Sequence, residues 1–232
     1  MSNSFDEHAS KYDAWFMDNT NVLLSEARLV AQTLAGSERI LSVGCGSGLF
    51  EKILRDDFGI NITDGIEPAL GMAEIARKRG MNVIVTTAED ADFGAGRYDT
   101  LLFNGSPSYI SDLQPIVEKA FDNLPEGGRL ILIDVPKESG YGMMYNLAKA
   151  TGSWDHPLLK GVAPANPYPI ELVNAANWRT SAEKIKAMQS AGFKNIEAWQ
   201  TLTTHPLMSD IEAEYPSKGA DKGDYVAIIG YK

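Results

Sequence analysis

The chain has 232 residues, of which 44% are hydrophobic and 22% are charged, and its formal net charge is −10. This is the composition of an ordinary globular protein and excludes a chain that is disordered throughout. The acidic balance argues against a nucleic-acid-binding surface, and the single cysteine, Cys45, excludes an internal disulfide and a metal site built from several cysteines.

One domain, residues 1–232, is expected from this length. Within it, residues 1–36 are expected to form a helical cap segment. The N-terminus is polar and acidic, and no apolar run approaches the length of a membrane span. We therefore expect a soluble, cytoplasmic protein that has neither a membrane nor a nucleic acid as its partner.

Strand and helix signals alternate from residue 20 to residue 135. The first helix is predicted over 22–35, with Asn21 as its cap, and the first strand over 39–43. A second apolar strand ends at Glu67. Pro68 is then expected at the first position of the next helix, where a missing N–H costs nothing.

Three further strands are predicted over 82–86, 98–104 and 128–135, with a helix capped by Ser111 between the last two. The strands at 98–104 and 128–135 contain continuous apolar runs instead of alternating ones. Such runs are typical of strands that are covered on both faces, as in a parallel sheet flanked by helices.

The pattern changes after residue 135. Residues 136–180 contain five prolines and several scattered aromatic residues, and we interpret them as an insert. Residues 180–183 read as a capping box that starts a helix. Two strands are predicted at the end of the chain, over 194–202 and 225–231.

A glycine pattern follows the first strand. Gly44, Gly46 and Gly48 stand at alternate positions, and Glu67 lies nineteen residues after the last of them, at the next strand end. Glycines let a backbone approach a ligand closely, and a carboxylate at this interval is placed to bind the hydroxyls of a ribose. Leu49 occupies the position of the third glycine in the dinucleotide fingerprint, so the pattern favours a nucleoside over a dinucleotide.

These motifs together resemble the class I S-adenosylmethionine-dependent methyltransferases of the small-molecule type. The resemblance rests on Gly44-x-Gly46-x-Gly48, on Ile66-Glu67-Pro68, on Thr87-Ala88-Glu89-Asp90 and on the opening stretch 5–16. It implies an α/β fold with a doubly wound, mostly parallel, seven-stranded sheet and an antiparallel edge hairpin. It also implies a small cap made of the N-terminal segment and the insert, which would lie on the acceptor side.

The resemblance further implies S-adenosylmethionine as the cofactor and a small-molecule methyl acceptor. Ser42 departs from the family pattern, which usually has Asp or Glu at this position, so the ammonium of the cofactor needs another partner. Cys45 reads as a small residue in the glycine turn. The cofactor residues implied are Gly44, Cys45, Gly46 and Gly48 for the methionine end, Glu67 and Pro68 for the ribose, Ala88, Glu89 and Asp90 for the adenine, and Asn104 near the transferred methyl.

Methyl transfer from a sulfonium is an in-line displacement in which alignment supplies much of the rate, and no metal is required. A base is needed only if the nucleophile must lose a proton. His156, within an aromatic stretch of the insert, is one candidate, and a loop histidine capped by Asp155 is the alternative. Tyr12 and Asn104 are the other candidate catalytic residues. An acceptor pocket is expected to have aromatic walls, although some of these rings could pack the cap instead. The aromatic candidates are Tyr12, Trp15, Tyr141, Tyr145, Trp154, Tyr168 and Trp178.

Two other functions remain open from the sequence. One is an NAD(P)-dependent oxidoreductase on a similar sheet, and the other is a non-catalytic protein that binds S-adenosylmethionine. Asn104-Gly105-Ser106-Pro107 lacks the second proline of the motif found in methyltransferases that act on nucleic-acid bases, so base methylation is disfavoured. The sequence identifies neither the acceptor, nor the attacked atom, nor the oligomeric state.

Overall fold

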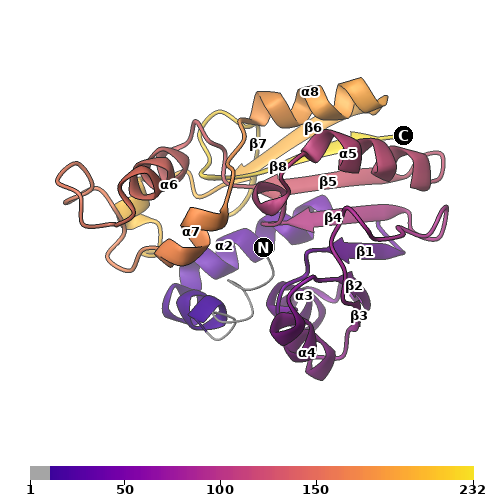
Figure 1. The fold of residues 1–232 in the computed structure, drawn as a ribbon, viewed down its shortest axis with the longest axis horizontal. Coiled ribbons are helices and arrows are strands. Elements are labelled where there is room, and N and C mark those ends of the chain that lie inside the picture. Colours follow the sequence, from indigo (N-terminus) through magenta and orange to yellow (C-terminus); the bar gives the residue numbers. More distant parts are fainter. Residues whose placement is uncertain (1–10) are drawn as a thin grey trace.

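The computed structural model describes residues 11–232, and a single eight-stranded sheet organises this part of the chain (Figure 1). The strand order is β3-β2-β1-β4-β5-β8-β6-β7. The strands are β1 (Ile40–Val43), β2 (Asp64–Ile66), β3 (Asn82–Ile84), β4 (Thr100–Asn104), β5 (Arg129–Asp134), β6 (Lys194–Thr201), β7 (Ser217–Lys218) and β8 (Tyr225–Tyr231).

The sheet is doubly wound and mostly parallel, as predicted. The chain starts near the middle of the sheet at β1, moves outward to β3, and returns to the other side of β1 with β4 and β5, all of them parallel. Strand β8 is antiparallel to both of its neighbours, β5 and β6. The order reverses beside β1, and a ligand site is therefore expected at the carboxyl ends of β1 and β4.

Helices cover both faces of the sheet. Apolar residues of α2 and α3 pack into one core cluster and those of α5 and α8 into another, so these two pairs lie on opposite faces. The helices are α2 (Thr20–Thr33), α3 (Leu49–Phe58), α4 (Leu70–Lys78), α5 (Leu113–Asn123), α6 (Gly140–Thr151), α7 (Ile170–Ala175) and α8 (Ser181–Ala191), with 3₁₀ turns η1 (Pro107–Tyr109) and η2 (Pro206–Met208). Residues 11–18 are also helical.

The continuous apolar runs in β4 and β5 arise because both faces of these strands are covered by helices, as the sequence indicated. In β4, Leu102 belongs to the cluster under α2 and α3, whereas Leu101 and Phe103 belong to the cluster under α5 and α8. In β5, Ile131 and Leu132 divide in the same way. Both faces of these strands are therefore buried, and side chains on both must be apolar.

Three predicted helix starts are wrong by one or two residues. Helix α2 starts at Thr20 with Asn19 as its cap residue, and Asn21 lies inside the helix, where its backbone N–H and its side chain donate to Asp210 at 2.8 Å each. Helix α5 is capped by Asp112, not Ser111. Pro68 precedes α4, which begins at Leu70.

The C-terminal part follows the prediction with one addition. Thr180 and Glu183 form the expected capping box, in which each side chain accepts a hydrogen bond from the backbone N–H of the other. Strands β6 and β8 pair antiparallel as expected. The short β7 adds an eighth strand beside β6. Within residues 11–232, no helix has both the length and the apolar character that crossing a membrane would need.

Candidate active site

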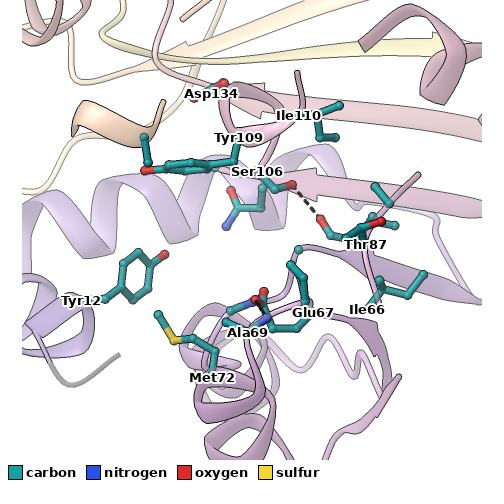
Figure 2. A pocket seen from close by; sticks show the side chains of 18 of the residues that line it. Tyr12, Ile66, Glu67, Ala69, Met72, Thr87, Ser106, Tyr109, Ile110 and Asp134 are labelled. Carbon is teal, nitrogen blue, oxygen red and sulfur yellow. Dashed lines mark hydrogen bonds between the residues drawn. The ribbon is translucent and has the colours of Figure 1, made fainter. Parts of the chain in front are cut away.

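A cavity of about 590 Å³ opens at the carboxyl ends of β1, β2, β4 and β5. Its volume lies in the range of sites that enclose small molecules and cofactors. Figure 2 shows labelled residues from separate parts of the chain around it, namely Tyr12, Met72, Ala69, Glu67, Thr87, Ser106 and Tyr109. The cavity therefore lies at the switch point of the sheet.

The loop after β1 approaches this cavity through its glycines. Gly44 has φ +73°, and a Cβ there would lie 2.5 Å from the Cβ of Ser106, so only glycine lets the loop pass this close to the end of β4. Gly46 also lines the cavity, and a Cβ on it would meet no atom within 4 Å. Gly46 thus leaves open space for a ligand, which fits the close backbone approach expected of the motif.

Glu67 lies at the end of β2 and is held in one orientation. Its Oε2 accepts a hydrogen bond from the Gly46 N–H at 2.9 Å, and its Oε1 accepts one from the Ala69 N–H at 2.8 Å. Glu67 is 6% exposed and lines the cavity. The glycine loop and the start of α4 therefore fix this carboxylate before any ligand arrives.

The loop after β3 forms another wall, and α5 anchors it. Ala88, Glu89 and Asp90 all line the cavity. The Lys119 Nζ donates hydrogen bonds to the backbone oxygens of Ala88 and Glu89, both at 2.9 Å, and of Ala91, at 2.7 Å. Sequence reasoning missed Lys119, because a lysine on a helix is ordinarily a solvated side chain.

Asn104 and Tyr12 both line the cavity. The Asn104 Oδ1 accepts a hydrogen bond from the Tyr225 hydroxyl at 2.8 Å, and its NH₂ group forms no hydrogen bond with residues 11–232. The Tyr12 hydroxyl points toward the hollow in Figure 2. Burial raises the pKa of Tyr12 well above its usual value, so the phenol is neutral near pH 7.

Three of the predicted site residues do not line the cavity. Cys45 is buried, and burial raises the pKa of its thiol well above the usual value. Gly48 serves packing, because a Cβ there would lie 2.9 Å from the Met81 Sδ. His156 lies in a loop, where its Nδ1 accepts a hydrogen bond from the Leu158 N–H at 3.2 Å. We therefore do not carry His156 forward as a base. The remaining predicted residues, Gly44, Gly46, Glu67, Pro68, Ala88, Glu89, Asp90, Asn104 and Tyr12, all line the cavity.

Ser42 stands where the family usually has a carboxylate, and a carboxylate lies next to it. The Ser42 Oγ donates to the Oε1 of Glu51, a buried residue of α3, at 2.6 Å. Glu51 does not itself line the cavity. Asp13, from the N-terminal segment, pairs with Arg79 at 2.6 Å. Two carboxyl groups therefore lie behind the glycine loop despite Ser42. Burial raises the pKa of Glu51, and the charge of Asp13 is balanced by Arg79.

Aromatic residues surround the other end of the cavity. Five of those proposed from the sequence line it, whereas Tyr141 and Trp154 do not. Phe16, Tyr109 and Tyr225 were missed, because no spacing pattern connects them. The aromatic lining is Tyr12, Trp15, Phe16, Tyr109, Tyr145, Tyr168, Trp178 and Tyr225.

Two buried carboxyl groups at this end were also missed. Glu26 of α2 is 7% exposed, and Asp134 at the end of β5 is 3% exposed. Burial raises the pKa of Glu26 well above its usual value and that of Asp134 to about 6. The signal in the sequence was a glutamate within the apolar face that Leu23 and Val30 define.

The model of a methyltransferase domain family matches residues 16–198, which is more than half of the chain. The chain belongs to this methyltransferase family. The sequence-based interpretation as an S-adenosylmethionine-dependent methyltransferase is thereby confirmed. The cavity fits that cofactor, since Gly46 provides open space beside a fixed carboxylate.

Individual relatives of this methyltransferase extend the comparison. A crystal structure from Thermotoga maritima, described as a possible histamine N-methyltransferase, shares 29% identity and a TM-score of 0.84, with 100% of both chains covered. An uncharacterized protein of Methanocaldococcus jannaschii is 28% identical over 99% of each chain. The trans-aconitate 2-methyltransferase of Agrobacterium fabrum is 25% identical over 83% of this chain and 73% of its own.

Replacing Lys119 by methionine is expected to weaken cofactor binding by about tenfold. The change removes three hydrogen bonds from a charged donor to the loop 88–91, and such bonds contribute about 1.5–3 kcal/mol each when buried but less at this partly exposed site. The affinity for S-adenosylhomocysteine, measured by calorimetry, checks this. Lys52→Met, which removes an exposed pair with Asp56, is the matched control. Equal affinities for the two variants would show that Lys119 does not shape the site.

Proposed function

We propose that this methyltransferase transfers the methyl group of S-adenosylmethionine to a small-molecule acceptor by in-line displacement. The observation that carries the proposal is one continuous cavity that joins the Gly46–Glu67 corner to an aromatic end. Asn104 is the last residue of β4. In the sheet, β4 lies between β1, which leads into the glycine loop, and β5, which ends at Asp134. When bound, the cofactor supplies an electrophilic methyl group.

The cofactor half is assigned by the residues that line it. Gly44 and Gly46 accommodate the methionine end, and Glu67 accepts hydrogen bonds from the ribose hydroxyls. The fixed orientation of Glu67 supports this role, because both of its oxygens already accept a backbone N–H on one side. Ala88, Glu89 and Asp90 surround the adenine. Pro68 lines the same wall and limits the backbone freedom there.

The acceptor half aligns the nucleophile and excludes water. Holding two reactants in near-attack geometry is worth about 7–11 kcal/mol, so positioning alone supplies much of the catalysis. Tyr12 and Asn104 are the positioning groups in our proposal. The Asn104 amide is oriented by Tyr225, and its NH₂ group remains to donate to a bound molecule. The aromatic lining favours a partly apolar acceptor.

The relatives do not agree on an acceptor. One is described as a possible histamine N-methyltransferase and others as trans-aconitate 2-methyltransferases, and these two acceptors carry charges of opposite sign. We therefore propose a small-molecule acceptor without deriving its charge from these relatives. A protein that binds the cofactor without turnover is the competing function, because no histidine of the described chain lines the cavity.

Transfer of a labelled methyl group tests the proposal. The protein is incubated with methyl-labelled S-adenosylmethionine and a metabolite extract from which macromolecules were removed, and in parallel with total protein and total RNA. The proposal predicts enzyme-dependent label in the small-molecule fraction. Label in the protein or RNA sample alone would contradict the acceptor class. Binding of the cofactor with no label in any fraction would identify a binding protein instead.

A further inference from the structure

Glu26 is a buried carboxyl group without a partner in the described chain. It lies in the middle of α2, is 7% exposed and lines the cavity. No hydrogen bond or opposite charge from residues 11–232 acts on its carboxyl group, whose pKa is raised by burial and by the charge of Asp134. An unpaired buried carboxylate costs folding free energy, because desolvation penalises its charge. A titratable group that is buried in a cleft without protein partners is a candidate for binding a ligand.

The charged side chains that line the cavity are all acidic among the described residues. Among the described lining residues there is no arginine, lysine or histidine, and the acidic ones are Glu26, Glu67, Glu89, Asp90 and Asp134. Asp134 has protein partners of its own, since its Oδ1 accepts the Val135 N–H at 2.8 Å and the nearby Lys184 opposes the burial that raises its pKa. Glu67 is held by backbone N–H groups. Glu26 is therefore the carboxyl group at the aromatic end of the cavity that has no hydrogen-bond donor or positive charge beside it.

Aromatic rings accompany this carboxyl group. Tyr12, Tyr145 and Tyr225 line the same cavity, and each is close enough to Glu26 for its charge to raise their pKa values. The faces of aromatic rings attract cations, and this attraction strengthens when the cation is desolvated. A carboxylate among aromatic rings is thus complementary to an ammonium group that carries an apolar body.

We propose that the acceptor is an amine that enters the cavity as an ammonium ion, with Glu26 as its ionic partner and the surrounding tyrosines as its aromatic wall. This inference rests on the proposed function, because it assigns the acceptor class of the same site. It also disfavours carboxylate acceptors, which would be buried without a cationic partner and would face acidic side chains.

Methylation of such an acceptor requires that its nitrogen lose one proton. The ammonium gives that proton to the Glu26 carboxylate, and the nitrogen lone pair forms the new N–C bond. The C–S bond breaks and its electron pair stays on sulfur, so the products are the methylated ammonium and S-adenosylhomocysteine. The proton on Glu26 then leaves to solvent. The raised pKa of Glu26 suits a group that must accept and hold this proton.

Matched ligands that differ in charge test the acceptor class. The protein saturated with S-adenosylhomocysteine is titrated with tyramine, 4-ethylphenol and 3-(4-hydroxyphenyl)propionate, and with the corresponding imidazole and indole series. Each series keeps the ring and changes an ammonium to a neutral group or a carboxylate. We expect at least one amine to bind, at least tenfold more tightly than its neutral and acidic counterparts. A carboxylate or neutral member that binds best, or the absence of any binding amine, would overturn the inference.

Glu26→Gln tests the assigned residue. We expect this variant to bind the amine about tenfold to a hundredfold more weakly, as is typical when a buried charged partner is removed, and to bind S-adenosylhomocysteine unchanged. Glu26→Asp keeps the charge and should retain the preference for the amine. Glu38→Gln, the same change at an exposed position, is the control. Absence of cofactor binding in the wild-type protein would refute the proposed function, whereas amine binding that survives in Glu26→Gln would refute this inference alone.

Stability separates this role from a structural one. The folded-state pKa of Glu26 lies above its unfolded value, so wild-type stability is lost as the pH rises from about 4.5 through the folded pKa. Glutamine does not titrate, and the melting temperature of Glu26→Gln should exceed that of wild type increasingly from pH 4.5 to pH 8. The other titratable groups facing Glu26 are Asp134 and the hydroxyls of Tyr12, Tyr141, Tyr145 and Tyr225, which both proteins share. A variant that is less stable than wild type at pH 8 would indicate a structural role.

Discussion

Glu67→Ala is expected to lower the affinity for S-adenosylhomocysteine by at least about a hundredfold. The change removes a charged acceptor from the ribose site, and hydrogen bonds to charged groups contribute about 1.5–3 kcal/mol each. It also leaves the Gly46 N–H and the Ala69 N–H without the acceptors that they have at 2.9 and 2.8 Å. The glycine loop and the start of α4 then lose the side chain that connects them.

Calorimetry with S-adenosylhomocysteine measures this loss, and circular dichroism checks that the variant folds. Glu67→Gln keeps one acceptor oxygen but places an NH₂ group against a backbone N–H, so its affinity should fall between those of wild type and Glu67→Ala. Glu74→Ala, at an exposed position of α4, is the control for removing a glutamate nearby. Wild-type affinity in Glu67→Ala would show that the cofactor does not bind at this corner.

Gly44→Ala is expected to lower the free energy of unfolding by about 2–5 kcal/mol. An alanine at φ +73° costs about 1–2 kcal/mol, and its Cβ, 2.5 Å from the Cβ of Ser106, overpacks the loop by about 1–3 kcal/mol. For a chain of this length the melting temperature should fall by about 5–15 °C. The shift of the loop should also weaken binding of S-adenosylhomocysteine.

Alanine variants of two other glycines distinguish the cost of backbone strain at positive φ from the cost of the close contact with Ser106. Gly59, at the end of α3, has φ +69°, and a Cβ there would meet no atom within 4 Å, so Gly59→Ala should cost only the strain and leave cofactor affinity unchanged. Gly46→Ala meets no protein atom either, but its methyl group would project into the cavity. Its stability should resemble that of Gly59→Ala while its cofactor affinity falls. Equal stability of the Gly44 and Gly59 variants would contradict the close contact with Ser106.

The succession of strands along the chain could be predicted because its signals are local, whereas the doubly wound arrangement of the sheet was implied by the family resemblance. Continuous apolar runs reported that β4 and β5 are buried on both faces, and the glycine loop and Glu67 marked the ends of β1 and β2. Helix starts were less predictable. At the start of α2, the side chain of Asp210, far along the chain, accepts the N–H groups of Asn21 and Val22, and Asn19 makes no side-chain capping bond. The two-residue β7 is too short to show a pattern.

The cofactor half of the site was also more predictable from the sequence than the acceptor half. The cofactor half follows one contiguous region, in which Gly46 and Glu67 are 21 residues apart, so its motif could be read from spacing. The acceptor half brings together α2, η1, α6 and β8, and no spacing connects Glu26 with Tyr225. His156 was proposed from its place in the aromatic insert beside Trp154. The Trp154 side chain donates to the Tyr168 backbone oxygen, and neither Trp154 nor His156 lines the cavity.

Binding of S-adenosylhomocysteine and of NADH to the wild-type protein, compared by titration calorimetry, tests the central claim most directly. We predict that S-adenosylhomocysteine binds with one molecule per chain, that NADH gives no binding heat, and that Glu67→Ala abolishes the signal at the same concentrations. Binding of NADH without binding of S-adenosylhomocysteine would contradict the assigned cofactor. Binding of S-adenosylhomocysteine that is indifferent to Glu67 would contradict the site that the structure defines.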